Sequence, residues 1–243
     1  MDPLVSTRVS LRWPPEPAAE LEDVLVIQGR SGFFLDLRTR RTSSQLVSGD
    51  GSRSTPSTQD AQVEWATAGW KVLLPPETGE NHPRARFDAV IDSRRSSSHP
   101  ISDDPLASDE GSFATLPDGD VLERGVMLRP ETGISAPYEE VWRRLPLARD
   151  GQPPRILILE ARDDQRHEHA FLGRVGDYEL GLLDGPAGFG VVRRELNEEG
   201  EWVTVASNEL GRMLPALATV DVTKSASSVE LGSRTWQVIE FSC

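Results

Sequence analysis

With 243 residues, the chain is long enough to bury a substantial core, either as one large domain or as two small ones. Its net charge of −13 excludes a general nucleic-acid binder and a polybasic membrane-surface protein, because both need clustered Lys and Arg. Of the 26 basic residues, only Lys71 and Lys224 are lysines, which we interpret as a codon-usage bias of the genome rather than as a functional signal.

Other gross features indicate a soluble intracellular protein. The single cysteine, Cys243, cannot form an internal disulfide. No segment approaches the roughly eighteen uninterrupted apolar residues of a membrane span. The N-terminus also lacks a basic start followed by an apolar run, so we expect no signal peptide.

The first predicted strands form a hairpin. Val24–Gln28 is a compact β-branched run, and Phe33–Arg38 alternates apolar and polar residues with a period of two. The glycine-containing stretch 29–32 between them is typical of a hairpin turn. The following stretch, 42–60, is rich in Ser, Thr, Gly and Asp and is expected to be a flexible loop.

Val63–Leu74 is the next expected strand, and it contains two tryptophans. Trp65 and Trp70 are five residues apart and would face opposite sides of an unbroken strand. We therefore expect Gly69 to mark a bend, a turn or a bulge that re-aims Trp70. Large aromatic side chains usually fill cores, so core packing is the simpler interpretation of both tryptophans.

Arg86–Asp92 alternates apolar and polar residues and leaves two interpretations open. In an open sheet, Arg86 and Asp88 would face water, whereas in a closed barrel they could face the lumen and bind a polar group. The stretch 93–120 that follows is again rich in Ser, Asp, Pro and Gly, and we expect a second flexible loop there.

The middle of the chain is expected to close the first barrel. Val121–Leu128 is a predicted strand, followed by a turn at Pro130–Gly133. If the strand runs unbroken, Glu123 and Arg129 share a face, either as a solvated pair or as polar groups at a barrel mouth. Tyr138–Leu145 has apolar residues at helical spacing, so a short helix capping the barrel is an alternative there.

The second half repeats the pattern of short strands. Arg155–Ala161 is nearly continuous in apolar residues, which is typical of a strand covered on both faces. Four further strands and a closing strand are expected at 170–175, 177–183, 190–196, 202–206 and Thr235–Phe241. Regular short strands with almost no helix predict an all-β protein. We divide it into antiparallel barrel domains at 1–147 and 148–243, joined by a linker at Asp150–Pro154.

Motifs for catalysis and metal binding are missing from the sequence. It has no nucleophile elbow, no zinc-protease helix, no phosphate-binding loop and no cysteine nucleophile. His167 and His169 would share a strand face, but a zinc site needs further ligands, so we expect no metal. The glycine-rich stretch 185–190 precedes a predicted strand rather than a helix, which argues against phosphate binding.

Four blocks of the sequence together resemble a known family. They are Val63–Gly69 (VEWATAG), Phe87–Asp92, the segment from Glu123 to Trp142, and Thr235–Phe241 (TWQVIEF). In their order and spacing they are similar to the fungal Hrr-interacting protein (HRI) family. The resemblance implies two lipocalin-like barrels in tandem and a cytoplasmic location, with the nucleus as a second one. It implies no catalytic residues, and the Ser-rich loops have no counterpart in it.

The functional hypothesis is a small-molecule-binding barrel for a hydrophobic ligand. Such a barrel can also catalyse a cofactor-free cyclisation or isomerisation, as Diels–Alder-type enzymes of fungal secondary metabolism do by analogy of fold. A non-enzymatic interaction protein with filled barrels is the alternative, and an open cavity of roughly 300 Å³ or more would argue against it. The candidate ligand-binding residues are Trp65, Trp70, Arg86, Asp88, Glu123 and Arg129. No cofactor, nucleic-acid partner or membrane partner is expected.

Overall fold

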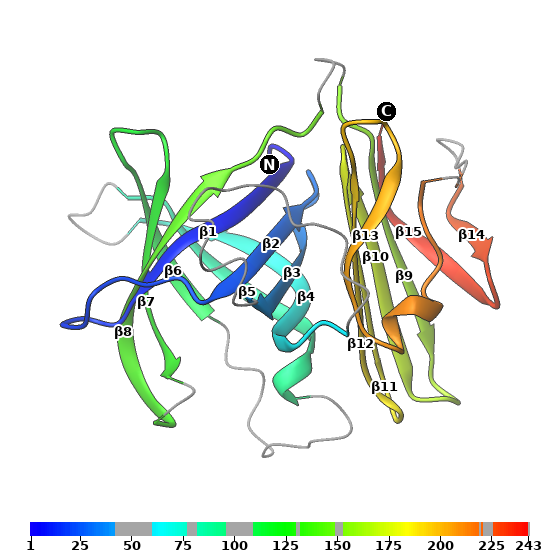
Figure 1. Ribbon diagram of the computed structural model, residues 1–243, viewed down its shortest axis with the longest axis horizontal. Coiled ribbons are helices and arrows are strands. Elements are labelled where there is room, and N and C mark those ends of the chain that lie inside the picture. Colours follow the sequence, from blue (N-terminus) through cyan, green and yellow to red (C-terminus); the bar gives the residue numbers. More distant parts are fainter. Residues whose placement is uncertain are drawn as a thin grey trace.

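The structure is a computed structural model that describes the chain except for residues 42–59, 77–81, 96–108, 130–131, 149–152, 219, 221–225 and 243. The first eight strands form a closed barrel in which each strand pairs antiparallel with its neighbours and β8 returns to pair with β1 (Figure 1). Their bounds are β1 Leu4–Arg12, β2 Glu22–Gln28, β3 Phe33–Arg40, β4 Val63–Leu74, β5 Arg84–Asp92, β6 Asp109–Thr115, β7 Val121–Arg129 and β8 Ile134–Arg144. Within these described strands the barrel has no free edge.

The remaining strands form a separate antiparallel sheet. Its strand order is β13-β12-β11-β10-β9-β15-β14, with β13 and β14 at the two edges of the described sheet. The bounds are β9 Ile156–Asp163, β10 Glu168–Val175, β11 Tyr178–Gly185, β12 Gly188–Leu196, β13 Trp202–Ser207, β14 Ser228–Leu231 and β15 Arg234–Ser242. Two 3₁₀ turns, η1 Ser93–Arg95 and η2 Gly211–Met213, are the only helical elements in the described residues.

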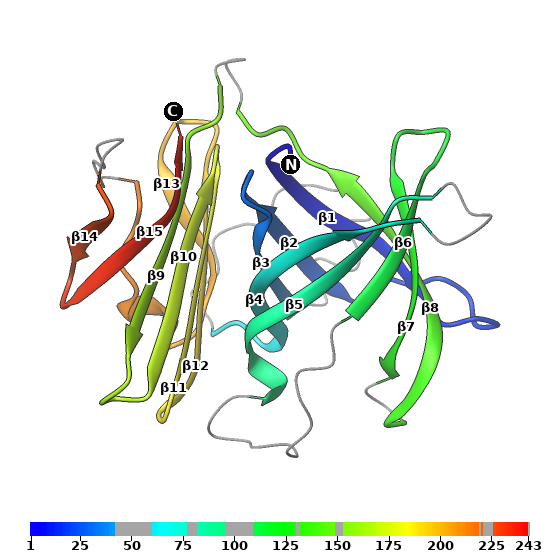
Figure 2. The same ribbon diagram turned by 180° about the vertical axis from the view of Figure 1, so that it is seen from behind.

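One hydrophobic core joins the barrel to the sheet. Figures 1 and 2 show the strands from β9 to β12 lying against the outside of β2, β3 and β4. Phe33 of the barrel and Phe171 of the sheet meet there with ring centroids 4.9 Å apart. A Cβ on Gly173 would lie 2.7 Å from Ile27 Cδ1, so the two layers pack too closely for a larger residue.

Polar contacts fix the orientation of the two layers. Glu240 on β15 accepts hydrogen bonds from the backbone N–H groups of Arg30 and Ser31 in the β2–β3 turn, both at 2.8 Å. Arg193 on β12 pairs with Asp23 on β2 at 3.0 Å. The division into domains at residues 147 and 148 stays a prediction, because the two layers share a core.

A second core covers the opposite face of the sheet. Leu157, Leu159 and Leu172 pack there under Trp236, whose side chain is fully buried. The segment after β13 covers this face with Leu214 and Leu217. The apolar run that begins β9 is therefore buried on both faces of the sheet, as its composition predicts.

The all-β class is confirmed, but several expectations change. A second closed barrel is not found, because the seven described strands after β8 form an open sheet. The helical alternative for Tyr138–Leu145 is wrong, since β8 runs through it as a strand. Strand β6 lies inside the stretch 93–120 that was expected to be a loop. The expected loop at 42–60 and the linker at Asp150–Pro154 lie largely outside the described residues.

Candidate ligand cavity in the barrel

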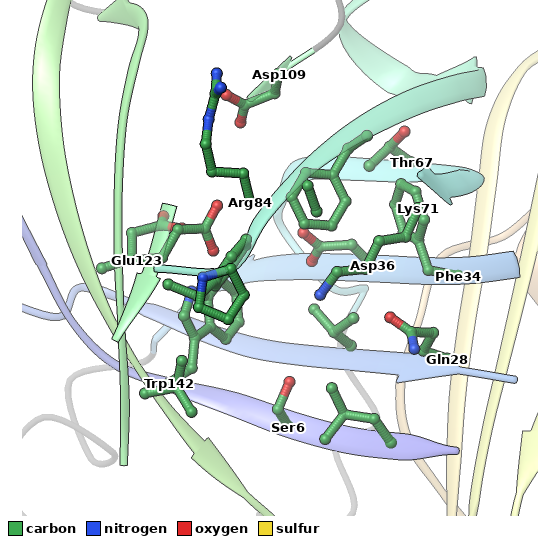
Figure 3. A pocket seen from close by; sticks show the side chains of 18 of the residues that line it. Ser6, Gln28, Phe34, Asp36, Thr67, Lys71, Arg84, Asp109, Glu123 and Trp142 are labelled. Atoms are coloured by element: carbon green, nitrogen blue, oxygen red, sulfur yellow. The ribbon is translucent and has the colours of Figure 1, made fainter. Parts of the chain in front are cut away.

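The barrel encloses a cavity of about 470 Å³. Side chains at alternate positions of the strands line it, because successive residues of a strand point to opposite faces. Figure 3 shows this lining converging from several strands. Its apolar part includes Leu4, Val26, Phe34, Leu73, Phe87, Phe113 and Val121, and its polar part includes Ser6, Gln28, Asp36, Arg38, Thr67, Lys71, Asp92, Asp109, Glu123, Glu140 and Arg144.

Two arginines organise the most buried charges of the barrel interior. Arg8 and Arg38 both donate to Glu140 Oε1, at 2.6 and 3.1 Å. Their remaining donors bind carboxylates on β2, β3 and the segment before β2, namely Glu20, Glu22 and Asp36. A buried ion is tolerated only when it is paired and hydrogen-bonded. These mutual pairings fix the positions of the charged side chains in the barrel interior.

Two polar atoms of the lining have no hydrogen-bond partner within the described part of the chain. They are the carboxylate oxygen Asp36 Oδ1 and the indole nitrogen Trp142 Nε1. Asp36 is 5% exposed, and its other oxygen accepts from Arg38 at 2.9 Å. An unsatisfied buried polar group costs about 1–3 kcal/mol, so a ligand that supplies the missing partners would gain from these atoms.

Lys71 is a cation of the lining that forms no ion pair with another described residue. Its Nζ lies 4.6 Å from the centroid of the Phe113 ring and 5.3 Å from that of Phe87. No hydrogen bond or ion pair joins this nitrogen to any other described residue. Desolvation by burial lowers the pKa of Lys71 below its ordinary value.

A pair of carboxyl groups forms a third polar feature. Tyr138 donates its hydroxyl to Glu123 Oε1 at 3.0 Å and lies 3.4 Å from Asp109 Oδ1. Burial, together with the nearby Glu140 carboxylate, raises the pKa of Glu123 to about 8. Burial also raises the pKa of Asp109 to about 6. Glu123 is therefore largely protonated at neutral pH and can act as an acid inside the cavity.

A β-bulge directs a further carboxylate into the cavity. The register between β4 and β5 shifts at Gly69, where Val90 is the extra residue on β5. As a result Ala89 and Asp92 both line the cavity although they are three residues apart. Asp92 accepts a hydrogen bond from Trp65 Nε1 at 2.8 Å. An irregularity at Gly69 is confirmed by this register shift, but the extra residue lies on β5 and Trp70 is not re-aimed toward the face of Trp65.

Of the six residues that the sequence proposes for ligand binding, two line the cavity. Glu123 does so as part of the carboxyl pair. Trp65 does so with its ring between two guanidinium groups, those of Arg38 at 4.4 Å and Arg94 at 4.3 Å. Both residues point inward because they have the inward parity of β7 and β4.

The other four lie outside the cavity. Arg86 and Asp88 pair with each other at 2.7 Å on the outward face of β5, so the solvent-facing alternative holds for them. Trp70 packs edge-on against Phe33, with centroids 5.0 Å apart, beside the core shared with the sheet. Arg129 binds Glu16 at 2.7 Å and stacks over Trp13 near the end of β7, so it does not share a site with Glu123.

The sequence reasoning missed Lys71, Asp36 and Trp142. Each has inward parity on a strand that the sequence predicts at least in part, but parity alone does not tell which face of a strand is the lumen. The one available signal was the rarity of lysine in an arginine-rich chain.

The described residues hold no cluster of three or more His, Cys, Asp or Glu suited to a metal ion. None of the helical elements in the described ranges is long and apolar enough to cross a membrane.

Fold and cavity together define an all-β protein with an eight-stranded closed barrel, a charged and aromatic internal cavity and an attached open sheet. The family model described as Protein HRI1 matches residues 4–240, and the chain belongs to this family.

A solved structure with a similar fold is that of the uncharacterized protein YLR301w from Saccharomyces cerevisiae. It is 16% identical to this chain and superposes with a TM-score of 0.73, with 99% of each chain covered. At this identity the likeness shows the fold alone. No curated protein sequence matches the chain significantly.

Proposed function

We propose that the protein binds a small amphipathic molecule in the barrel cavity. The observation that supports this most strongly is a partly open cavity of about 470 Å³ whose lining includes polar atoms without a hydrogen-bond partner among the described residues. Ligand pockets of this kind are mostly apolar with a few placed polar groups, and an eight-stranded lipocalin-like barrel has room for one small ligand. A barrel filled by its own side chains, as the non-enzymatic alternative requires, would not have this cavity.

The lining indicates which chemistry the ligand carries. Phe34, Phe87 and Phe113 offer an apolar surface to a hydrophobic body. Lys71 Nζ and the indole N–H of Trp142 are hydrogen-bond donors without an acceptor among the described residues. They therefore favour a carbonyl or carboxylate oxygen on the ligand. Asp36 Oδ1 is an acceptor and favours a hydroxyl or N–H group.

Catalysis is a second candidate function that uses the same cavity. A cofactor-free cyclase or isomerase, as in fungal secondary metabolism, needs a shaped enclosure and a proton donor where charge develops. Glu123, protonated near neutral pH beside the Tyr138 hydroxyl, is a donor of this kind. We propose the cytoplasm, with the nucleus as a second location, as the site of action.

The binding proposal is tested by filling the cavity. The probe is ANS (anilinonaphthalene sulfonate), which has an apolar body, an anionic head and fluorescence that rises on desolvation. Ala89 lines the cavity, so Ala89→Phe should weaken saturable ANS binding by about tenfold or more, equivalent to about 1.4 kcal/mol. The matched control is Val126→Phe, at a position that is 61% exposed and outside the lining.

Unchanged ANS affinity in a folded Ala89→Phe protein would overturn the proposal, whereas selective loss in that variant supports it. Circular dichroism and thermal unfolding establish that the variant is folded. Mass spectrometry of small molecules extracted from the purified protein then identifies the natural ligand, and only ligands absent from the Ala89→Phe preparation count.

A further inference from the structure

Lys71 has the surroundings of a nucleophilic amine. Its side chain leaves β4 into the cavity, where Figure 3 shows it among the polar groups of the lining. Its Nζ is bounded by the rings of Phe87 and Phe113 rather than by carboxylates. An ammonium group in such a place is stabilised only by ring faces, which replace its hydration shell incompletely.

Lysine differs chemically from arginine at such a position. Guanidinium groups stay charged in proteins, whereas a buried lysine loses its proton readily and then carries a free electron pair. The chain uses arginine for nearly all its basic residues, and all cationic members of the buried carboxylate network are arginines. Lys71 is the one lysine of the cavity lining, and it forms no ion pair with another described residue.

A proton donor lies on the same side of the barrel. Phe113 on β6 is the register partner of Glu123 on β7, and Phe113 also contacts the Lys71 ammonium at 4.6 Å. Glu123 is therefore the strand neighbour of the aromatic residue that contacts Lys71, and its carboxyl group acts electrostatically on the lysine. Among the described residues, Glu123 and Arg144 are the charged groups that act on Lys71, and the raised pKa of Glu123 weakens its support for the ammonium form near pH 7.

We propose that Lys71 forms an imine with an aldehyde or ketone ligand that occupies the barrel cavity. The inference rests on the proposed binding function and adds to it the class of ligand, a carbonyl compound with an apolar body. It also names a residue that bonds to the ligand.

The reaction balances with groups that the cavity supplies. The neutral Nζ of Lys71 adds its electron pair to the carbonyl carbon, and one of the two Nζ protons passes to the carbonyl oxygen to give a carbinolamine. The Glu123 carboxyl group then protonates the hydroxyl, which leaves as water. Nζ loses its remaining proton to the Glu123 carboxylate as the carbon–nitrogen double bond forms. One carbonyl and one amine are consumed, and one imine and one water are produced.

The unsatisfied atoms fit the same pose. Before the addition step, the carbonyl oxygen of the ligand can accept a hydrogen bond from Trp142 Nε1, which has no acceptor among the described residues. The donor would polarise the carbonyl and stabilise the negative charge that develops on its oxygen. Phe34, Phe87 and Phe113 then enclose the apolar remainder and exclude water that would hydrolyse the imine.

The test uses cinnamaldehyde as the probe and cyanoborohydride to reduce any imine to a stable amine. Intact-mass spectrometry should show one adduct, heavier than the protein by the aldehyde less one oxygen atom, and peptide mapping should place it on Lys71. Because the cavity concentrates the aldehyde beside the amine, Lys71 should be labelled about tenfold or more faster than Lys224 in the same molecule.

Three variants separate the chemistry from a merely structural effect. Lys71→Arg keeps the positive charge and should abolish the fast adduct, whereas Lys224→Arg should leave it unchanged. Glu123→Gln keeps the shape of the acid and should slow labelling at Lys71 without removing it. Equal labelling of Lys71 and Lys224, or a fast adduct that survives in a folded Lys71→Arg protein, would overturn the proposal.

Cinnamyl alcohol distinguishes this failure from failure of the binding function. The alcohol has the same apolar body but forms no imine. If it displaces ANS from the wild-type protein while the aldehyde leaves no adduct on Lys71, the imine inference is wrong and cavity binding stands. If neither the alcohol nor ANS binds the wild-type protein, both proposals fall together.

Discussion

The barrel and the open sheet use the same kind of strand but bury different things. In the sheet, β9 has apolar residues on both faces, and two hydrophobic cores cover them. In the barrel, the outward face of β2 and β3 joins the first of these cores, while the inward face carries charges and a cavity. The sheet therefore has a packed apolar interior on both faces, whereas the barrel, which packs against one of these faces, has a cavity inside it.

The difference explains where function can reside. A tightly packed apolar interior leaves no space for a ligand, whereas a closed ring of strands fixes the positions of polar groups around an open volume. The barrel interior keeps its charges through ion pairs such as that of Arg8 with Glu140. Asp36 Oδ1 and Trp142 Nε1 in the barrel, like Arg155 Nε beside the sheet, have no hydrogen-bond partner among the described residues, so the cavity rather than these atoms distinguishes the barrel.

The largest effect on stability is expected from breaking the buried charge network of the barrel. Arg8→Met removes the partner of three carboxylates while its own side chain is 1% exposed, and should lower the free energy of unfolding by about 3–5 kcal/mol. Chemical denaturation of both proteins measures this difference. The control is Arg86→Met, which breaks an exposed pair on the outward face and should change stability too little to measure. Equal losses in the two variants would contradict a buried network.

Matched leucine truncations compare the two interiors directly. Leu172→Ala in the sheet removes a fully buried side chain and should cost about 2–5 kcal/mol, because it leaves a cavity in a packed core. Leu73→Ala removes the same atoms from the cavity wall, where the leucine is 61% exposed, and should cost less than about 1 kcal/mol. Leu73→Ala should weaken ANS binding instead, and Leu172→Ala should not. Denaturation and ANS titration of both variants test whether the sheet core supplies stability while the barrel wall supplies ligand binding.

The smallest effect is a pH dependence that arises from Glu123 in the barrel interior. Glu123 has a folded pKa of about 8 against an ordinary value of 4.5, so the folded state binds more protons than the unfolded state between these values. Stability is therefore fully present below pH 4.5 and falls as the pH rises toward about 8. The slope contributed by Glu123 is at most about 1.4 kcal/mol per pH unit. Asp109, with a pKa of about 6, is half titrated at pH 6 and has largely finished titrating by pH 7, so the contribution of Glu123 is clearest between pH 7 and pH 8.

Glu123→Gln mimics the protonated acid and should flatten the stability curve between pH 6 and pH 8. Its control is Glu139→Gln, since the Arg124 guanidinium lowers the pKa of Glu139 and that group does not titrate in this window. Thermal unfolding across the window measures both curves relative to the wild-type protein. A slope that persists in Glu123→Gln would mean that another group binds the proton.

Local patterns in the sequence predict the strands better than they predict the site. Period-two alternation finds β3, β5 and most of β7, because each has one face against an apolar layer. It misses β6, whose sequence DEGSFAT reads as a loop and becomes a strand only because β5 and β7 lie on either side of it. The helical alternative at Tyr138–Leu145 is wrong for a similar reason, since pairing with β1 and β7 outweighs the helical spacing of its apolar residues.

The prediction of ligand-binding residues was wrong where it required knowing which face of a strand points into the barrel. Arg86 and Asp88 alternate correctly on β5, yet they face outward, and the inward carboxylate of that strand is Asp92 because Val90 is an extra residue in the bulge. The expectation that Gly69 re-aims Trp70 was wrong, because Trp65 lines the cavity while Trp70 lies outside it, as in an unbroken strand. Lys71 directly follows Trp70 in the sequence, and its side chain lies on the cavity side of β4, opposite to that of Trp70.

By itself, the sequence determined that this is an all-β protein of short antiparallel strands, because apolar alternation and turn residues act over a few positions of the chain. Only the tertiary structure decided that β1 to β8 close into a barrel while β9 to β15 stay an open sheet, since closure depends on β8 meeting β1 more than a hundred residues away. It also decided that Lys71, Asp36, Trp142 and Glu123 surround one cavity. Side chains from four strands come together only when the barrel is closed. A pattern of neighbouring residues in the sequence does not show which distant strands will lie side by side.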